Sequence, residues 1–173
     1  MRHRLNVALW LLVAAPLLAS CVSSTTIVRA VQHESLRPYS QARADLPPPT
    51  AGSLRLYIYR PQAIVGAWGG AIVIVNGRWF GDPANYITNN MLIPGAVFVV
   101  DVPDGTAHVT WAQPGRPQGT DKPLELSSAS SPVAYLRWTL KPTYGLLEQV
   151  PAEQATREID PLRFSGHVAL GAP

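Results

Sequence analysis

Apolar and polar residues alternate with a period of two along several short stretches of this chain. Residues 54–60 read Leu-Arg-Leu-Tyr-Ile-Tyr-Arg, so Leu54, Leu56 and Ile58 fall on one side, and Arg55, Tyr57 and Tyr59 fall on the other. Residues 107–111 follow the same rule, with Ala107, Val109 and Trp111 on the inner side. This alternation predicts strands that bury one face. Residues 96–102 are apolar on both sides except for one aspartate, which predicts a central strand covered on both faces.

Turn signals separate these stretches. Asn76-Gly77 lies between residues 71–75 and 78–80, and this dipeptide favours a two-residue hairpin because both positions tolerate a positive φ. Pro103-Asp104-Gly105 is a second turn signal, placed between the two stretches 96–102 and 107–111. Three further stretches have strand character: residues 124–126, 133–140 and 146–150.

The hydrophobic period changes near the C-terminus. Pro151 suits the first turn of a helix, and Ala152, Ala155 and Ile159 then share one face at helical spacing. We therefore expect one short helix packed on a sheet edge, ended by Asp160-Pro161. Residues 161–173 are expected to form a loose tail.

Together these elements predict a mainly β domain over residues 54–160. The expected fold is an antiparallel β-sandwich of about seven or eight strands with one short C-terminal helix. A small closed barrel is the alternative. The 13 glycines and 17 prolines agree with a chain of many turns and few long helices.

The N-terminus has a different pattern. Arg2 and Arg4 precede the apolar run Val7–Leu18, and the small residues Ala19 and Ser20 follow it. This order is typical of a secretory signal peptide, here residues 1–20. The run of 12 residues is too short to span a bilayer, which takes about 20. We expect a signal helix that is cleaved from the mature protein.

The signal ends in Leu18-Ala19-Ser20-Cys21, which resembles the lipobox of bacterial lipoproteins. The resemblance implies cleavage between Ser20 and Cys21 and attachment of acyl chains such as palmitate to Cys21. Two or three acyl chains anchor a protein firmly in a lipid bilayer. The expected location is the bacterial cell envelope. The resemblance to known lipoproteins implies the outer membrane, facing the periplasm, because Val22 and Ser23 carry no acidic sorting signal; the inner membrane is the alternative. A secreted protein with an unlipidated Cys21 is the alternative.

Charge and cysteine content narrow the function. The chain has 14 Lys+Arg and 11 Asp+Glu; removing Arg2 and Arg4 with the signal leaves 12 basic and 11 acidic residues, a net charge of +1. The mature chain therefore lacks the basic character of nucleic-acid-binding proteins. Cys21 is the only cysteine, so lipidation leaves no thiol for a disulfide, a metal or a nucleophile.

Residues 21–53 are expected to be a tether between the lipid and the domain. Pro47-Pro48-Pro49 favours stiff polyproline II, and residues 22–53 would reach roughly 110 Å when fully extended. Alternatively, Ile27, Val28 and Val31 dock part of residues 27–39 on the domain as a short strand or helical turn.

The order of these motifs is similar to that of a known family. The motifs are the lipobox, Leu56–Pro61, Val75-Asn76-Gly77, residues 102–108 and a late strand around Tyr135. They resemble small bacterial lipoproteins that share an uncharacterised β-rich domain of unknown function, over about residues 54–159. The long loop from Asp82 to Pro94 departs from that pattern. The resemblance implies a β-rich envelope domain and no activity for any residue.

Few residues are candidates for catalysis or metal binding. His108 lies near Asp101 and Asp104 along the chain, but an exposed strand histidine and a turn-forming aspartate are the interpretations that we favour. The glycine-rich residues 66–70 lack the Gly-Lys-Ser/Thr of a phosphate loop, and the Gly-x-Ser-x-Gly and His-Glu-x-x-His motifs are absent. We expect no catalytic residue, no metal and no cofactor.

Aromatic residues in or beside loops are the remaining candidates: Trp68, Trp79, Tyr86 and Tyr144. Such side chains anchor partners or stack on sugars at a low entropic cost. Trp79 could instead fill the core beside Phe80. We therefore expect a non-enzymatic interaction module that binds another envelope protein. The alternative is a domain that binds a small ligand or cell-wall glycan through its loop aromatics.

Overall fold

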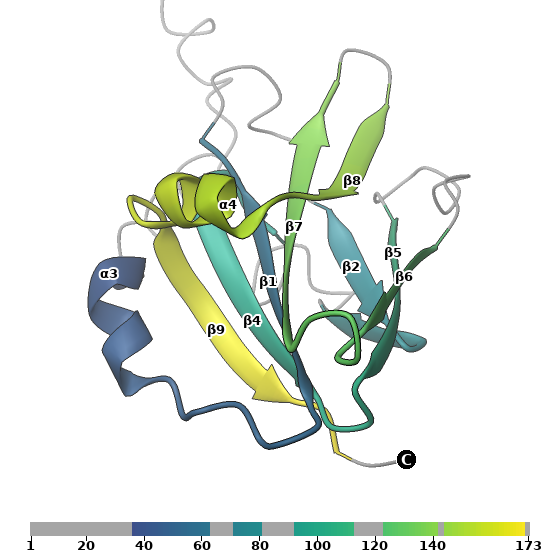
Figure 1. Cartoon of the computed structure of the whole chain (residues 1–173). Coiled ribbons are helices and arrows are strands. Elements are labelled where there is room, and N and C mark those ends of the chain that lie inside the picture. Colours follow the sequence, from purple (N-terminus) through teal and green to yellow (C-terminus); the bar gives the residue numbers. More distant parts are fainter. Residues whose placement is uncertain (1–35, 63–70, 81–91, 113–122, 142–143, 172–173) are drawn as a thin grey trace, which may run out of the picture. The chain divides into compact units, whose positions relative to one another are not determined.

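The computed structural model describes residues 36–62, 71–80, 92–112, 123–141 and 144–171, apart from the side chain of Trp79. Residues from Leu36 onward form one compact unit, which contains two sheets and two helical segments (Figure 1). The elements in chain order are α3 (Tyr39–Ala42), η1 (Arg43–Asp45), β1 (Leu54–Arg60), β2 (Ile72–Val75), β3 (Arg78–Phe80), β4 (Ala96–Val102), β5 (Thr106–Ala112), β6 (Leu124–Ser127), β7 (Val133–Leu140), β8 (Gly145–Gln149), α4 (Ala152–Ile159) and β9 (Arg163–Ala169).

The two sheets differ in strand direction. The smaller sheet has the order β3-β2-β5-β6 and is antiparallel throughout. The larger sheet has the order β8-β7-β1-β4-β9, and it is mixed because β1 is parallel to β7 and β4 is parallel to β9. The expectation of a mainly β fold is confirmed. The expectation of a wholly antiparallel sandwich is wrong for the larger sheet, where the chain crosses over, rather than turning back, to reach β7 and β9.

One hydrophobic core joins the two sheets. β1 and β4 of the larger sheet supply the buried Leu56 and Val100, and β2 and β5 of the smaller sheet supply Val75 and Val109. The inner positions predicted for residues 54–60 and 107–111 are all in this core. Both faces of β4 are buried, as its composition predicted, because Val97 packs in a second cluster on the outer face.

Both predicted turns are present. Asn76 and Gly77 have φ values of 50° and 75° and join β2 to β3, as a type I′ hairpin requires. Gly105 has a φ of 68° between β4 and β5, and a Cβ at this position would lie 2.3 Å from Ser128 Oγ. Glycine therefore allows the chain to pass from one sheet to the other here without strain or overlap.

The second cluster lies on the outer face of the larger sheet. Helix α4 forms where it was predicted, but the expectation that it packs on a sheet edge is wrong, because Ala155 and Ile159 are buried on this face with Tyr59 of β1 and Val97 of β4 (Figure 1). The helix carries the chain across the sheet from β8 to β9, which then pairs with β4. The prediction of a loose tail is therefore wrong for residues 163–169. A register shift opposite Val97 and Phe98, together with Gly166 at a φ of 153°, interrupts the alternation that would have revealed β9.

The expected tether also differs from the structure. Residues 39–45 form α3 and η1, and Pro38 makes a β-bridge with Arg163. The chain is thus packed on the domain from Leu36, not from residue 54. Ile27, Val28 and Val31 lie outside the described residues. In the part of the chain that is described, no helix is long and apolar enough to cross a membrane.

Candidate functional site

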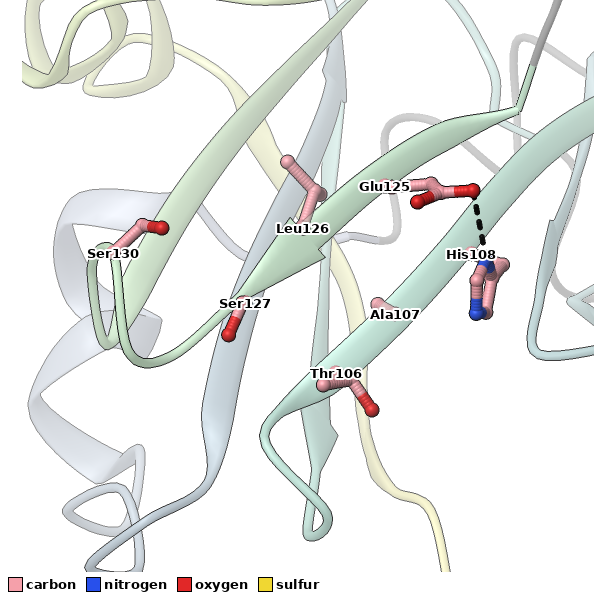
Figure 2. Close-up of a pocket in the computed structure, with 7 residues that line it drawn as sticks. All are labelled: Thr106, Ala107, His108, Glu125, Leu126, Ser127 and Ser130. Atoms are coloured by element: carbon pink, nitrogen blue, oxygen red, sulfur yellow. Dashed lines mark ion pairs between the residues drawn. The ribbon is translucent and has the colours of Figure 1, made fainter.

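A groove of about 320 Å³ lies along β5 and β6 (Figure 2). The antiparallel register places His108 opposite Glu125 and Thr106 opposite Ser127. Its full lining is Thr106, Ala107, His108, Glu125, Leu126, Ser127 and Ser130.

Side chains that can form hydrogen bonds line the groove, and few contacts within the protein hold these side chains in place. His108 Nδ1 lies 3.7 Å from Glu125 Oε1, and both side chains are more than 60 % exposed. Such an exposed pair contributes little to stability. Nearby, Asn76 fixes the backbone of β5, since its side chain accepts a hydrogen bond from the His108 amide and donates one to the Thr106 carbonyl. The hydroxyls, the imidazole and the carboxylate suit a polar ligand better than an apolar one.

Of the three residues that the sequence offered for acid–base work, His108 and Asp101 lie in different sheets. His108 is in the smaller sheet, whereas Asp101 is in β4 of the larger one. Asp101 accepts hydrogen bonds from Arg55 Nε at 2.6 Å and Arg55 Nη2 at 2.7 Å, and His167 Nε2 lies 2.8 Å from its second oxygen. Asp104 is an exposed turn residue.

These contacts set the charge of Asp101. Burial raises the pKa of its carboxyl, but hydrogen bonds from Arg55 and His167 outweigh burial and hold the pKa below its usual range. The hydrogen bond to Asp101 raises the pKa of Arg55 in turn. The Asp101 carboxylate therefore links β4 to Arg55 of β1 and His167 of β9.

A second network ties α4 to the larger sheet. Glu158 accepts hydrogen bonds from Tyr59 Oη at 2.6 Å and from Arg137 Nη1 at 2.9 Å. Arg137 also bonds to Glu148 on the neighbouring strand. Burial raises the pKa of Glu158, and the hydrogen bonds from Tyr59, Gln154 and Arg137 outweigh it and lower the pKa.

Of the four predicted loop aromatics, Tyr144 is the one whose side chain the structure describes. It is 54 % exposed and lies between β7 and β8, where its carbonyl accepts a hydrogen bond from the Lys141 amide. The next residue, Gly145, packs so tightly that an added Cβ would lie 2.7 Å from Trp111. The backbone below Tyr144 is therefore fixed while its ring projects into solvent.

The structure gives less information on the remaining predicted site residues. Trp79 is paired with Ile74 in the smaller sheet, but its side chain lies outside the described part. Phe80 fills the core, with its ring centroid 5.6 Å from that of Phe98. Trp68, Tyr86, Ser20 and Cys21 lie outside the described residues.

Sequence reasoning missed a tyrosine cluster on the outer face of the larger sheet. Tyr57 stacks on Tyr135 with ring centroids 5.1 Å apart, and Tyr39 of α3 meets Tyr57 edge-on at 6.2 Å. Burial is the main reason why the pKa of Tyr39 is raised. The signal in the sequence was a tyrosine at an outward position in each of the stretches 54–60 and 133–140. Only the parallel pairing of β1 with β7, however, places Tyr57 beside Tyr135.

Within the described residues, no group of three or more His, Cys, Asp or Glu side chains is arranged to hold a metal ion. Comparison with known proteins gives no match to a family model, a curated protein or a solved structure.

Proposed function

We propose that this protein is a lipid-anchored protein of the bacterial cell envelope whose β-rich domain is a non-enzymatic interaction module. The observation that carries the anchor is Leu18-Ala19-Ser20-Cys21 at the end of a short apolar run. In this proposal the signal helix is removed, Cys21 is acylated, and the domain faces the periplasm from the outer membrane.

The proposed interaction role rests on the contacts that the polar side chains of the domain make. Asp101, Glu158 and the arginines that contact them hold strands and α4 together. His108 is exposed beside Glu125. The most exposed large aromatic side chain among the described residues is Tyr144, beside the tightly packed Gly145. An exposed tyrosine on a fixed backbone suits a protein contact, because little entropy is lost on binding.

The anchor is tested with Cys21→Ala in cells grown with labelled palmitate. We expect the wild-type protein to carry label and to sediment with membranes, and the variant to lose both. Retention of label by the variant would refute acylation at Cys21. Crosslinking in cells, with adducts identified by mass spectrometry, then tests for one dominant envelope protein as the partner.

A small polar ligand or a cell-wall glycan is the second candidate, favoured by the hydroxyl-lined groove at β5 and β6 (Figure 2). The loop aromatics Trp68, Trp79, Tyr86 and Tyr144 would supply stacking surfaces for sugar rings. Titration with soluble cell-wall fragments tests it through tryptophan fluorescence. A saturable change that Ser127→Ala weakens would support this candidate, and an unchanged spectrum at saturating fragment would exclude it.

A further inference from the structure

The segment from Leu36 to Thr50 crosses the domain before β1 begins, and we call residues 36–50 the strap. Its first residues lie beside the start of β9. The Tyr39 amide donates to the Leu162 carbonyl and the Phe164 amide donates to the Arg37 carbonyl, both at 2.8 Å. These two bonds flank the bridge between Pro38 and Arg163.

The apolar contacts of the strap are few. Ala42 is its only buried residue, and Tyr39 is half-buried, packs on the second cluster and meets the Tyr57 ring edge-on. Helix α3 has four residues and no side-chain cap at its N-terminus. A helix this short is not stable by itself in water, so its docking depends on these contacts.

The ion pairs of the strap are weak. The ion pair between Arg37 and Asp45 lies within the strap and does not hold it on the sheet. The pair between Arg43 and Asp160 does reach the domain, but both side chains are more than half exposed. Exposed pairs of this kind contribute about 0–1 kcal/mol.

The sheet beneath does not need the strap to stay intact. The Arg55 side chain donates to the Pro47 carbonyl at 2.7 Å, but it also makes its two bonds to Asp101 within the sheet. Tyr57 keeps its stacking partner Tyr135, and β1 remains paired with β4 and β7 on both sides. Opening of the strap alone is therefore a local event.

We propose that residues 36–50 are a releasable strap that sets the length of the tether between Cys21 and the sheets. With the strap docked, residues 22–35 connect the two and reach at most roughly 50 Å. With the strap released, residues 22–50 connect them and reach at most roughly 100 Å. This consequence for the tether rests on the proposed acylation of Cys21, whereas the release itself does not.

Hydrogen exchange of the mature, full-length chain in detergent micelles, followed by mass spectrometry at increasing sub-denaturing urea, tests the release. We expect the amides of residues 39–46 to exchange at least about 100-fold faster than those of β1, at a rate that urea does not change, because a small opening exposes little surface. Strap exchange that rises with urea in parallel with β1 would overturn the proposal, since the strap would then open only with the whole domain.

A disulfide supplies the matched control. Pro38 and Arg163 form an antiparallel pair without hydrogen bonds between them, whose Cα atoms are typically about 4.5 Å apart, within the range that a disulfide spans. Oxidised Pro38→Cys/Arg163→Cys should slow strap exchange at least about tenfold and leave β1 unchanged. Reduction, or the Pro38→Ser/Arg163→Ser pair, should restore fast exchange. An oxidised variant that exchanges like the wild type would contradict a strap that opens at this bridge.

A second variant does not depend on a disulfide. Tyr39→Ala removes the ring that contacts Tyr57 and should speed strap exchange several-fold, while Gln41→Ala on the exposed side of α3 should not. Equal effects of the two substitutions would count against docking through Tyr39. The intact mass of the same sample reports acylation of Cys21 separately, so failure of the anchor and failure of the strap are distinguishable.

Discussion

Asp101 shows how a single residue joins three strands of the larger sheet. It lies on β4, and its carboxylate bonds to Arg55 of β1 and His167 of β9. Only 14 % of its side chain is exposed. We predict that Asp101→Asn lowers the free energy of unfolding by about 2–4 kcal/mol, because the buried Arg55 loses its counter-charge. Urea denaturation at pH 7 measures it, and Asp104→Asn at the exposed turn is the control with little effect.

The same carboxylate gives a pH dependence with a defined sign. Since the pKa of folded Asp101 lies below the unfolded value of about 3.9, its contribution is complete above that value and is lost as the pH falls through the folded pKa. The stability difference between the wild type and Asp101→Asn should therefore shrink below about pH 4. A difference that stays constant down to pH 2.5 would contradict the assignment.

A comparison of two glycines with similar backbone angles distinguishes the cost of backbone strain from the cost of steric overlap. Gly77 and Gly105 both have positive φ, but a Cβ would meet nothing within 4 Å at Gly77 and would meet Ser128 Oγ at 2.3 Å at Gly105. We predict that Gly77→Ala costs about 1 kcal/mol from backbone strain alone. Gly105→Ala should cost roughly 3 kcal/mol or more, because Ser128 and the Gly52 carbonyl must also move. Similar thermal unfolding midpoints for the two variants would refute this difference.

At the scale of secondary-structure elements, the sequence pattern predicted those features that depend only on neighbouring residues. The alternation at residues 54–60, the apolar run at 96–102 and the Asn76-Gly77 turn gave β1, β4 and the first hairpin, because each depends on neighbours along the chain. Strand partners depend on residues far apart. The parallel pairings of β1 with β7 and of β4 with β9 left no signal in any single stretch. The tyrosine stack, which needs the first of these pairings, was missed for the same reason.

Strand β9 provides the prediction at this scale. It covers the free edge of β4, whose Val99 and Val100 are fully buried. Truncation after Leu162 should expose that edge, abolish cooperative thermal unfolding and promote aggregation, since an unpaired strand edge recruits other strands. Truncation after Gly171 is the control and should unfold as the full-length chain does. A cooperative, monomeric truncation at Leu162 would show that β9 is dispensable.

At the scale of the whole molecule, the two faces of the larger sheet are both covered. The inner face packs on the smaller sheet, while α4 and the strap lie on the outer face. An aromatic residue of the larger sheet that contacts a partner must then lie at an end or an edge of that sheet. Tyr144, at the end of the β7–β8 hairpin, is the described aromatic residue that meets this condition.

A photo-crosslinking amino acid placed at single positions of the anchored chain tests this surface in cells. Position Tyr144 should give one dominant adduct with an envelope protein, because its ring projects from a backbone that Gly145 fixes against Trp111 and Trp138. Arg157, 73 % exposed on α4, is the matched control and should give none. An adduct from Arg157 and not from Tyr144 would move the interface to the outer face of the larger sheet. Recovery of Tyr144 adducts on wall glycan would instead favour sugar binding by the same hairpin, since a tyrosine ring also stacks on sugars.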